Sequence, residues 1–189
     1  MEALLTSTAV VALAEIGDKT QLLAMVLAAR FRKPVPIALG ILLATIANHF
    51  LAALAGYYVA GLLEGAWLRW AVGISFIAMA AWTLVPDKLD DDESPGISGA
   101  GAFLTTLVAF FLVEIGDKTQ VATVALAARF EAVVMVTIGT TIGMLLANVP
   151  VVYLGDKLVA RLPLKAVRIG AALLFLVLGL WVLWLAASG

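Results

Sequence analysis

Apolar residues dominate six long stretches of the chain, and polar residues gather in the segments between them. A helix needs ~20 predominantly apolar residues to cross the hydrocarbon core of a bilayer. Each stretch is about that length or longer, so the pattern predicts six transmembrane helices. The stretches are residues 4–29, 35–62, 67–85, 101–128, 132–154 and 164–186.

One connection differs from the others because it is longer and strongly acidic. It runs from residue 86 to residue 100 and ends in Ser-Pro-Gly followed by small residues. Such a composition is typical of a solvated, flexible linker. We therefore expect three parts: a first three-helix repeat (1–85), the acidic linker (86–100) and a second three-helix repeat (101–189).

Composition supports a chain that lies almost wholly in the membrane. Of its 189 residues, 63% are hydrophobic and 13% are charged, and the mean hydropathy is +1.09. Soluble domains are closer to half apolar and a quarter charged. The sequence leaves no room for a soluble catalytic or nucleic-acid-binding domain. The net charge of −1 argues against a nucleic-acid partner, and the lack of cysteine excludes disulfides and thiolate metal sites.

A seven-residue motif, Glu-Ile-Gly-Asp-Lys-Thr-Gln, occurs at 15–21 and again, letter for letter, at 114–120. Residues 15–31 and 114–130 agree at twelve of seventeen positions. Beyond them, Gly40 pairs with Gly139, and Asn48 lies one step out of register from Asn148. Because each half would hold three helices, the second half would enter the membrane from the opposite side. The predicted fold class is therefore an all-α integral membrane protein with six transmembrane helices arranged as two inverted three-helix repeats.

The basic residues predict the orientation. Two arginines, Arg69 and Arg129, would lie on one side of the membrane, and eight basic residues on the other. Lysine and arginine concentrate on the cytoplasmic side of membrane proteins. Both termini should therefore face outward, with the linker in the cytoplasm. The eight are Arg30, Arg32, Lys33, Lys88, Lys157, Arg161, Lys165 and Arg168.

The repeated motif places charges deep inside two apolar stretches, where ionisable residues mark functional sites. On a continuous helix, residues three and four apart share a face, so Glu15, Asp18 and Lys19 would project together. The second copy would do the same with Glu114, Asp117 and Lys118. Crossing of the two helices at the midplane would bring together four carboxylates and two ammonium groups, with a formal charge of −2. The glycines of the two motifs would also permit a break in each helix.

A divalent cation would neutralise this cluster. We predict Glu15, Asp18, Glu114 and Asp117 as ligands, and an all-oxygen site suits calcium, magnesium or manganese. Neutral oxygens are available from Thr20, Thr119, Gln21, Gln120, Asn48 and Asn148. The lone histidine, His49, would either bind manganese or carry a proton, or simply bond to a neighbouring helix. Lys19 and Lys118 would hold the carboxylates ionised or replace the metal electrostatically. The plainer alternative is that each motif is an ion pair that only joins helices.

The doubled E-x-G-D-K-T motif, on the first and fourth of six helices, resembles the manganese/calcium cation:proton antiporters known as uncharacterised protein family 0016. Its members include bacterial manganese exporters, the Golgi transmembrane protein 165 and chloroplast manganese transporters. The resemblance covers essentially the whole chain and implies that Glu15, Asp18, Glu114 and Asp117 bind the ion. The sequence has no N-terminal targeting extension, as in the bacterial members. We therefore expect a multi-pass protein of the bacterial inner membrane.

The expected function is a secondary transporter that exports Mn²⁺, or Ca²⁺, in exchange for protons by alternating access. It would be no enzyme and would need no cofactor beyond the transported ion; its partners would be the divalent metal, protons and the lipid bilayer. One alternative is export of an amino acid or another small organic cation. A remoter one is an intramembrane aspartyl protease using Asp18 and Asp117. A lysine follows each aspartate and would oppose the proton sharing that such a pair needs. The sequence decides neither the metal, the proton stoichiometry nor the oligomeric state.

Overall fold

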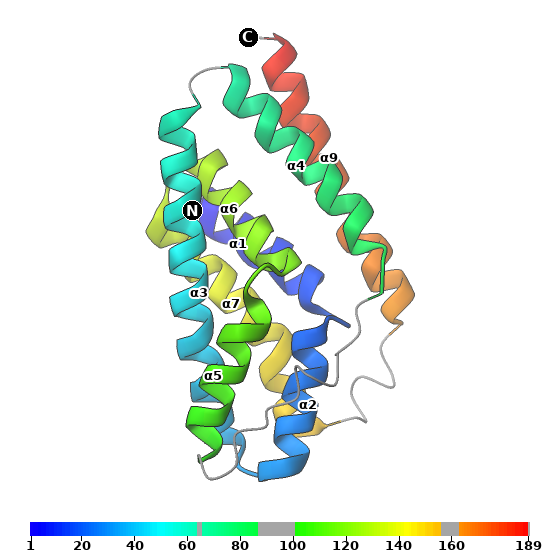
Figure 1. Ribbon diagram of the computed structural model, residues 1–189. Coiled ribbons are helices and arrows are strands. Elements are labelled where there is room, and N and C mark those ends of the chain that lie inside the picture. Colours follow the sequence, from blue (N-terminus) through cyan, green and yellow to red (C-terminus); the bar gives the residue numbers. More distant parts are fainter. Residues whose placement is uncertain (64–65, 87–100, 156–162, 189) are drawn as a thin grey trace.

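The computed structural model describes residues 1–63, 66–86, 101–155 and 163–188, all of them helical or in short connections (Figure 1). Outside these ranges lie the acidic linker from residue 87 on, which includes Lys88, and the basic residues Lys157 and Arg161. The first half contains α1 (Glu2–Glu15), α2 (Lys19–Phe31), α3 (Pro34–Leu62) and α4 (Ala66–Thr83). The second contains α5 (Ala102–Glu114), α6 (Lys118–Phe130), α7 (Val133–Leu154) and α9 (Leu164–Ser188).

Four of these helices, α3, α4, α7 and α9, are long and apolar enough to cross a membrane. Many of their large apolar side chains, such as Leu43, Ile74, Leu173 and Val177, are exposed on the outside of the molecule. A soluble monomer rarely exposes apolar surface on that scale. The described chain is an all-helical membrane protein, as its composition predicts.

The first and fourth predicted stretches are not single helices. Each is divided into two half-helices of 13 or 14 residues, α1 with α2 and α5 with α6. The break falls at the repeated motif in both, which confirms the interruption that the glycines permit. Irregular backbone at this depth is tolerated in membrane proteins only where it is buried in protein or lines a cavity.

Helices of the two halves pack against each other in a reciprocal pattern. α1 packs mainly against α7, and its counterpart α5 packs against α3. Glycine allows both approaches. A Cβ added to Gly139 would lie 2.9 Å from the Cβ of Ser7, and one added to Gly40 would lie 2.7 Å from the Cβ of Thr106. Small residues let membrane helices pack closely in this way.

The other long helices, α4 and α9, form an antiparallel pair along one side of the molecule (Figure 1). The pair contacts the rest mainly through α6 and α1. The interlocked helices α1, α2, α3, α5, α6 and α7 therefore surround the two motifs.

Candidate cation site

Glycine creates the turn in each motif. Gly17 and Gly116 have φ angles of +83° and +78°, a region that glycine enters without the steric cost of a Cβ. The helix before each turn ends at the motif glutamate, and the next helix begins at the motif lysine. The side-chain oxygens of Gln21 and Gln120 close the turns, accepting the N–H of Gly17 at 2.9 Å and of Gly116 at 2.7 Å.

This geometry corrects the expectation that each motif lies on one face of a continuous helix. Glu15 is the last residue of α1, whereas Asp18 is the N-cap of α2. The two carboxylates therefore come from different helices and approach each other across the turn. The carbonyl end of α1 also points into the site, and the partial negative charge of a helix C-terminus favours a cation.

Glu15 is fully buried and is held by residues from both halves. The hydroxyl of Thr20 donates a short hydrogen bond to Oε2, and the amide of Asn148 on α7 donates another at 3.3 Å. Among the described residues, Oε1 of Glu15 and Oδ1 of Asn148 have no hydrogen-bond partner and are shielded from solvent. Each of these two hydrogen-bonded side chains thus keeps a buried oxygen that is available to bind a cation.

Glu114 is equally buried, but the described side chains engage both of its oxygens. Thr45 donates to Oε1 at 3.1 Å, and Asn48 donates to Oε2 at 3.0 Å. Both donors lie on α3, in the other half of the chain. Thr45 was not predicted from the sequence. Its position three residues before Asn48, on the same helix face, is the signal that could have identified it.

Three of the four predicted carboxylates converge. One ligand oxygen from each of Glu15, Asp18 and Asp117 lies within 4.8 Å of the others, and all three residues are buried. Calcium–oxygen bonds are about 2.3–2.6 Å, so two ligands of one ion lie at most about 5 Å apart. The three oxygens can therefore contact a single divalent cation without a large movement of the backbone.

In this structure the four predicted carboxylates and the two lysines do not have equivalent surroundings. Glu114 lies close enough to Glu15 and Asp117 for their charges to interact, yet it is not part of the three-ligand group. The lysines also differ. Lys118 is buried, donates to the backbone oxygen of Val85 at 3.1 Å and lies 6.0 Å from the ring centre of Trp82, whereas Lys19 is half-buried.

The neutral residues of the motifs mainly organise the carboxylates. Thr119 donates to Asp117 at 3.3 Å. Gln120 donates to the side-chain oxygen of Asn48 at 3.1 Å, and Gln21 donates to the backbone oxygen of Ala147 at 3.0 Å. These glutamines are therefore structural in this conformation, since their own oxygens already accept backbone N–H groups.

His49 follows Asn48 on α3 and is fully buried. Neither ring nitrogen has a hydrogen-bond partner within the described part of the chain. The simple expectation of a histidine that bonds to a neighbouring helix is therefore not met among those residues. The three-ligand group does not include His49.

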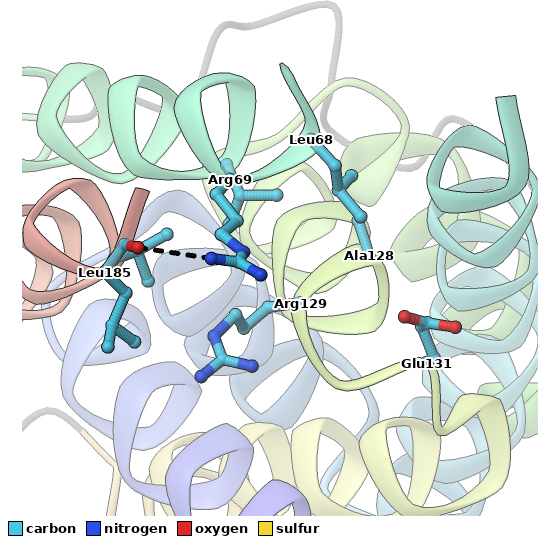
Figure 2. Close-up of a pocket in the computed structure, with 8 residues that line it drawn as sticks. Leu68, Arg69, Ala128, Arg129, Glu131 and Leu185 are labelled. Carbon is cyan, nitrogen blue, oxygen red and sulfur yellow. Dashed lines mark hydrogen bonds between the residues drawn. The ribbon is translucent and has the colours of Figure 1, made fainter. Parts of the chain in front are cut away.

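A separate cavity of about 460 Å³ lies between α4, α6 and α9, at the end of the molecule where α6 ends (Figure 2). Arg69 and Arg129 extend toward each other there, and Arg69 donates to the backbone oxygen of Leu185 at 3.2 Å. Arg129 packs over the ring of Trp181 at 5.4 Å. Among the described residues, the charged lining of this cavity is two guanidinium groups and the single carboxylate of Glu131, a set that disfavours a divalent cation.

Comparison with known proteins gives a consistent picture. The sequence model of the family described as "Divalent cation/proton antiporter GDT1" matches residues 3–91 and 102–189. A Vibrio cholerae protein named "Putative manganese exporter" is 52% identical over 181 residues, covering 95% of this chain and 90% of its own length. GDT1-like protein 5 of Arabidopsis thaliana is 28% identical, covering 92% of each chain.

A second Arabidopsis thaliana relative, GDT1-like protein 3, is 27% identical over 93% of this chain and 68% of its own length. No solved structure matches the chain. The buried carboxylates therefore lie in a chain that resembles these proteins along almost its whole length.

Proposed function

The chain belongs to the GDT1 family of divalent cation/proton antiporters, and we propose that it exports Mn²⁺ through the site formed by Glu15, Asp18 and Asp117. The family consists of transporters, so the chain is not an enzyme. This argues against the alternative of an intramembrane aspartyl protease. The observation that carries the proposed site is the convergence of the three buried ligand oxygens within 4.8 Å.

Two observations bear on the cargo: the ligand chemistry and the name of a relative. Carboxylate and amide oxygens suit manganese and calcium equally well. The name of the Vibrio cholerae relative, 52% identical, favours manganese. Calcium is the second candidate, because it accepts the same oxygen ligands.

Exchange follows from competition between metal and proton for the same oxygens. Three carboxylates confined within 4.8 Å, with Glu114 beside them, cannot all remain ionised at low cost without a counter-charge. In the absence of metal, at least one of them should hold a proton. Metal binding releases that proton, and proton binding weakens the hold on the metal.

The architecture that we propose is six transmembrane spans in two inverted repeats. In this arrangement α1 with α2 form one broken span and α5 with α6 another. The two ranges that match the family model lie on either side of residues 92–101, close to the predicted linker. Broken helices at a repeat interface are a recurrent plan for ion sites in secondary transporters. Residues 1–85 would move against residues 101–189, in the bacterial inner membrane, with both termini outside.

Flux measurements in inverted membrane vesicles test the proposal. With a pH gradient imposed, Mn²⁺ uptake should exceed Mg²⁺ uptake, and a trapped pH-sensitive dye should report proton movement in the opposite direction. A Glu15→Gln variant, present at equal abundance, is the control. Manganese movement without proton movement would contradict antiport at this site, and faster uptake of Ca²⁺ than of Mn²⁺ would reassign the cargo.

A further inference from the structure

From the level of the carboxylates, α7 runs toward one end of the molecule and α3 toward the other, and the buried faces of these two helix segments differ. The outer end is defined here by the end of α6 and the start of α7, and the inner end by the end of α2 and the start of α3. Under the proposed orientation, the outer end is extracytoplasmic. Asn148 on α7 and Asn48 on α3 mark the level of the site, because each donates a hydrogen bond to a motif glutamate.

On α7, two threonines lie on the same face as Asn148, toward the outer end. Thr141 and Thr137 precede Asn148 by seven and eleven residues, which is about two and three helical turns. At ~1.5 Å rise per residue, they lie about 10 and 16 Å from the site along the helix. Beyond the buried Met144, these threonines therefore continue the face of Asn148 to about one turn from the start of α7.

The hydroxyls of these threonines are buried and unused. Within the described part of the chain, neither Oγ1 has a hydrogen-bond partner. Other buried threonines here, such as Thr106, Thr123 and Thr140, donate to the carbonyl one turn earlier at 2.7–2.9 Å. Buried hydroxyls are rarely left unpaired, so each such group calls for an explanation. Unlike the other threonines, Thr137 and Thr141 have hydroxyls that remain able to bind a water molecule or a cation.

Beyond Thr45, which donates to Glu114 at the level of the site, the corresponding face of α3 is apolar. The same count back from Asn48 leads to Ile41 and Ile37, both completely buried. They belong to a cluster with Leu23 and Leu27 of α2. Two threonines toward the outer end are therefore matched by two isoleucines toward the inner end. A third buried hydroxyl without a partner, that of Ser7 on α1, also lies in the outer half.

We propose that Thr137 and Thr141 line the outer half of the ion and proton path, and that Ile37 and Ile41 close the inner half in this conformation. Hydroxyl oxygens can replace part of the water around a passing cation. Packed aliphatic side chains exclude water, and such hydrophobic constrictions gate by dewetting. The assignment of the threonine-lined half to the outer side of the membrane rests on the proposed function. The difference between the threonine face of α7 and the isoleucine face of α3 is independent of it.

Thiol accessibility tests the path without requiring transport. The chain has no cysteine, so Thr141→Cys, Thr140→Cys and Ile41→Cys each introduce one thiol. A cationic, membrane-impermeant methanethiosulfonate should modify Thr141→Cys from the outer side, and added Mn²⁺ should slow this reaction. Thr140→Cys is the matched control, since its native hydroxyl is bonded to the backbone. Equal labelling of Thr140→Cys and Thr141→Cys, or labelling of Ile41→Cys as fast as Thr141→Cys, would overturn the proposal.

Flux measurements provide a second test. Thr141→Val removes the hydroxyl at nearly constant volume and should lower the Mn²⁺ flux about two- to tenfold. This fold-change corresponds to the loss of one hydrogen bond of ~0.5–1.5 kcal/mol. Equilibrium Mn²⁺ binding should not change, and Thr141→Ser should keep wild-type flux. Thr140→Val should affect flux less than Thr141→Val; an equal effect would contradict the path. Failure of the wild-type protein to move Mn²⁺ would refute the proposed cargo, while the labelling result would still decide the path.

Discussion

The side-chain amide of Asn48, on α3, donates a hydrogen bond of 3.0 Å to Oε2 of Glu114, the last residue of α5. The second half repeats this relationship with the roles exchanged, because Asn148 on α7 donates to Glu15 at the end of α1. Each half of the chain therefore holds the motif glutamate of the other. A movement of one half against the other changes both contacts together, which links the two carboxylates mechanically.

Replacement of either asparagine should destabilise the protein and slow transport. Asn48→Ala leaves a buried glutamate oxygen without its donor, which costs about 1–3 kcal/mol. Thermal unfolding in detergent and Mn²⁺ flux would measure the two effects. Ser75→Ala is a suitable control, since the Ser75 hydroxyl bonds only to the backbone oxygen of Val72 on α4. An Asn48→Ala variant with the stability and flux of Ser75→Ala would exclude the proposed role.

Glu15→Gln and Glu114→Gln should both abolish transport but should differ in metal binding. Glu15 belongs to the three-ligand group and has an oxygen without a hydrogen-bond partner among the described residues. Its amide variant should lose Mn²⁺ binding, measured by calorimetry. Glu114→Gln should retain binding in this conformation, because Thr45 and Asn48 already engage both Glu114 oxygens. Wild-type transport by either variant would remove that carboxylate from the mechanism.

Alanine substitutions of the two turn glycines should destabilise the protein to different extents. Both positions have positive φ, which costs an L-residue about 1–2 kcal/mol. A Cβ at Gly17 would also lie 3.1 Å from Cδ2 of Leu164, whereas a Cβ at Gly116 meets nothing within 4 Å. Gly17→Ala should therefore have the lower melting temperature. Equal melting temperatures would show that Leu164 moves aside without cost, and a lower value for Gly116→Ala would contradict the prediction.

Lys118→Ala should lower stability more than Lys19→Ala. The Lys118 ammonium is buried and joins the start of α6 to the backbone just after α4, through Val85. Its loss removes this link and leaves space where a buried side chain packed beside Trp82. Lys19→Ala should also reduce Mn²⁺ flux less than Glu15→Gln does, if the lysines are structural. Denaturation curves and flux assays on matched preparations would test both statements.

The predicted orientation can be checked in intact cells. A cysteine introduced at Asp91, in the acidic linker, should resist an impermeant thiol reagent applied from outside, because the distribution of basic residues predicts a cytoplasmic linker. A cysteine introduced at Ala187, near the C-terminus, should react. Labelling at position 91 from outside would show that the linker is extracytoplasmic. The end of the molecule that we call outer would then face the cytoplasm.

The long helices and the type of site could be predicted from the amino-acid sequence alone. The apolar stretches predict α3, α4, α7 and α9 nearly to their ends, since length and hydropathy alone decide whether a helix suits a bilayer. The repeated motif, with its charges at membrane depth, identified a cation transport function, and the family comparison confirms it. The glycines at 17 and 116 already permitted the two breaks.

Only the tertiary structure decided which side chains meet. Helical spacing placed Glu15 and Asp18 on one face, but the turn at Gly17 separates them into two helices. Identical motifs then acquire different surroundings: Glu15 joins Asp18 and Asp117, whereas Glu114 is bound by Thr45 and Asn48. Local sequence fixes backbone preferences within a few residues. The neighbours of a buried carboxylate come from helices far along the chain, and their packing alone determines them.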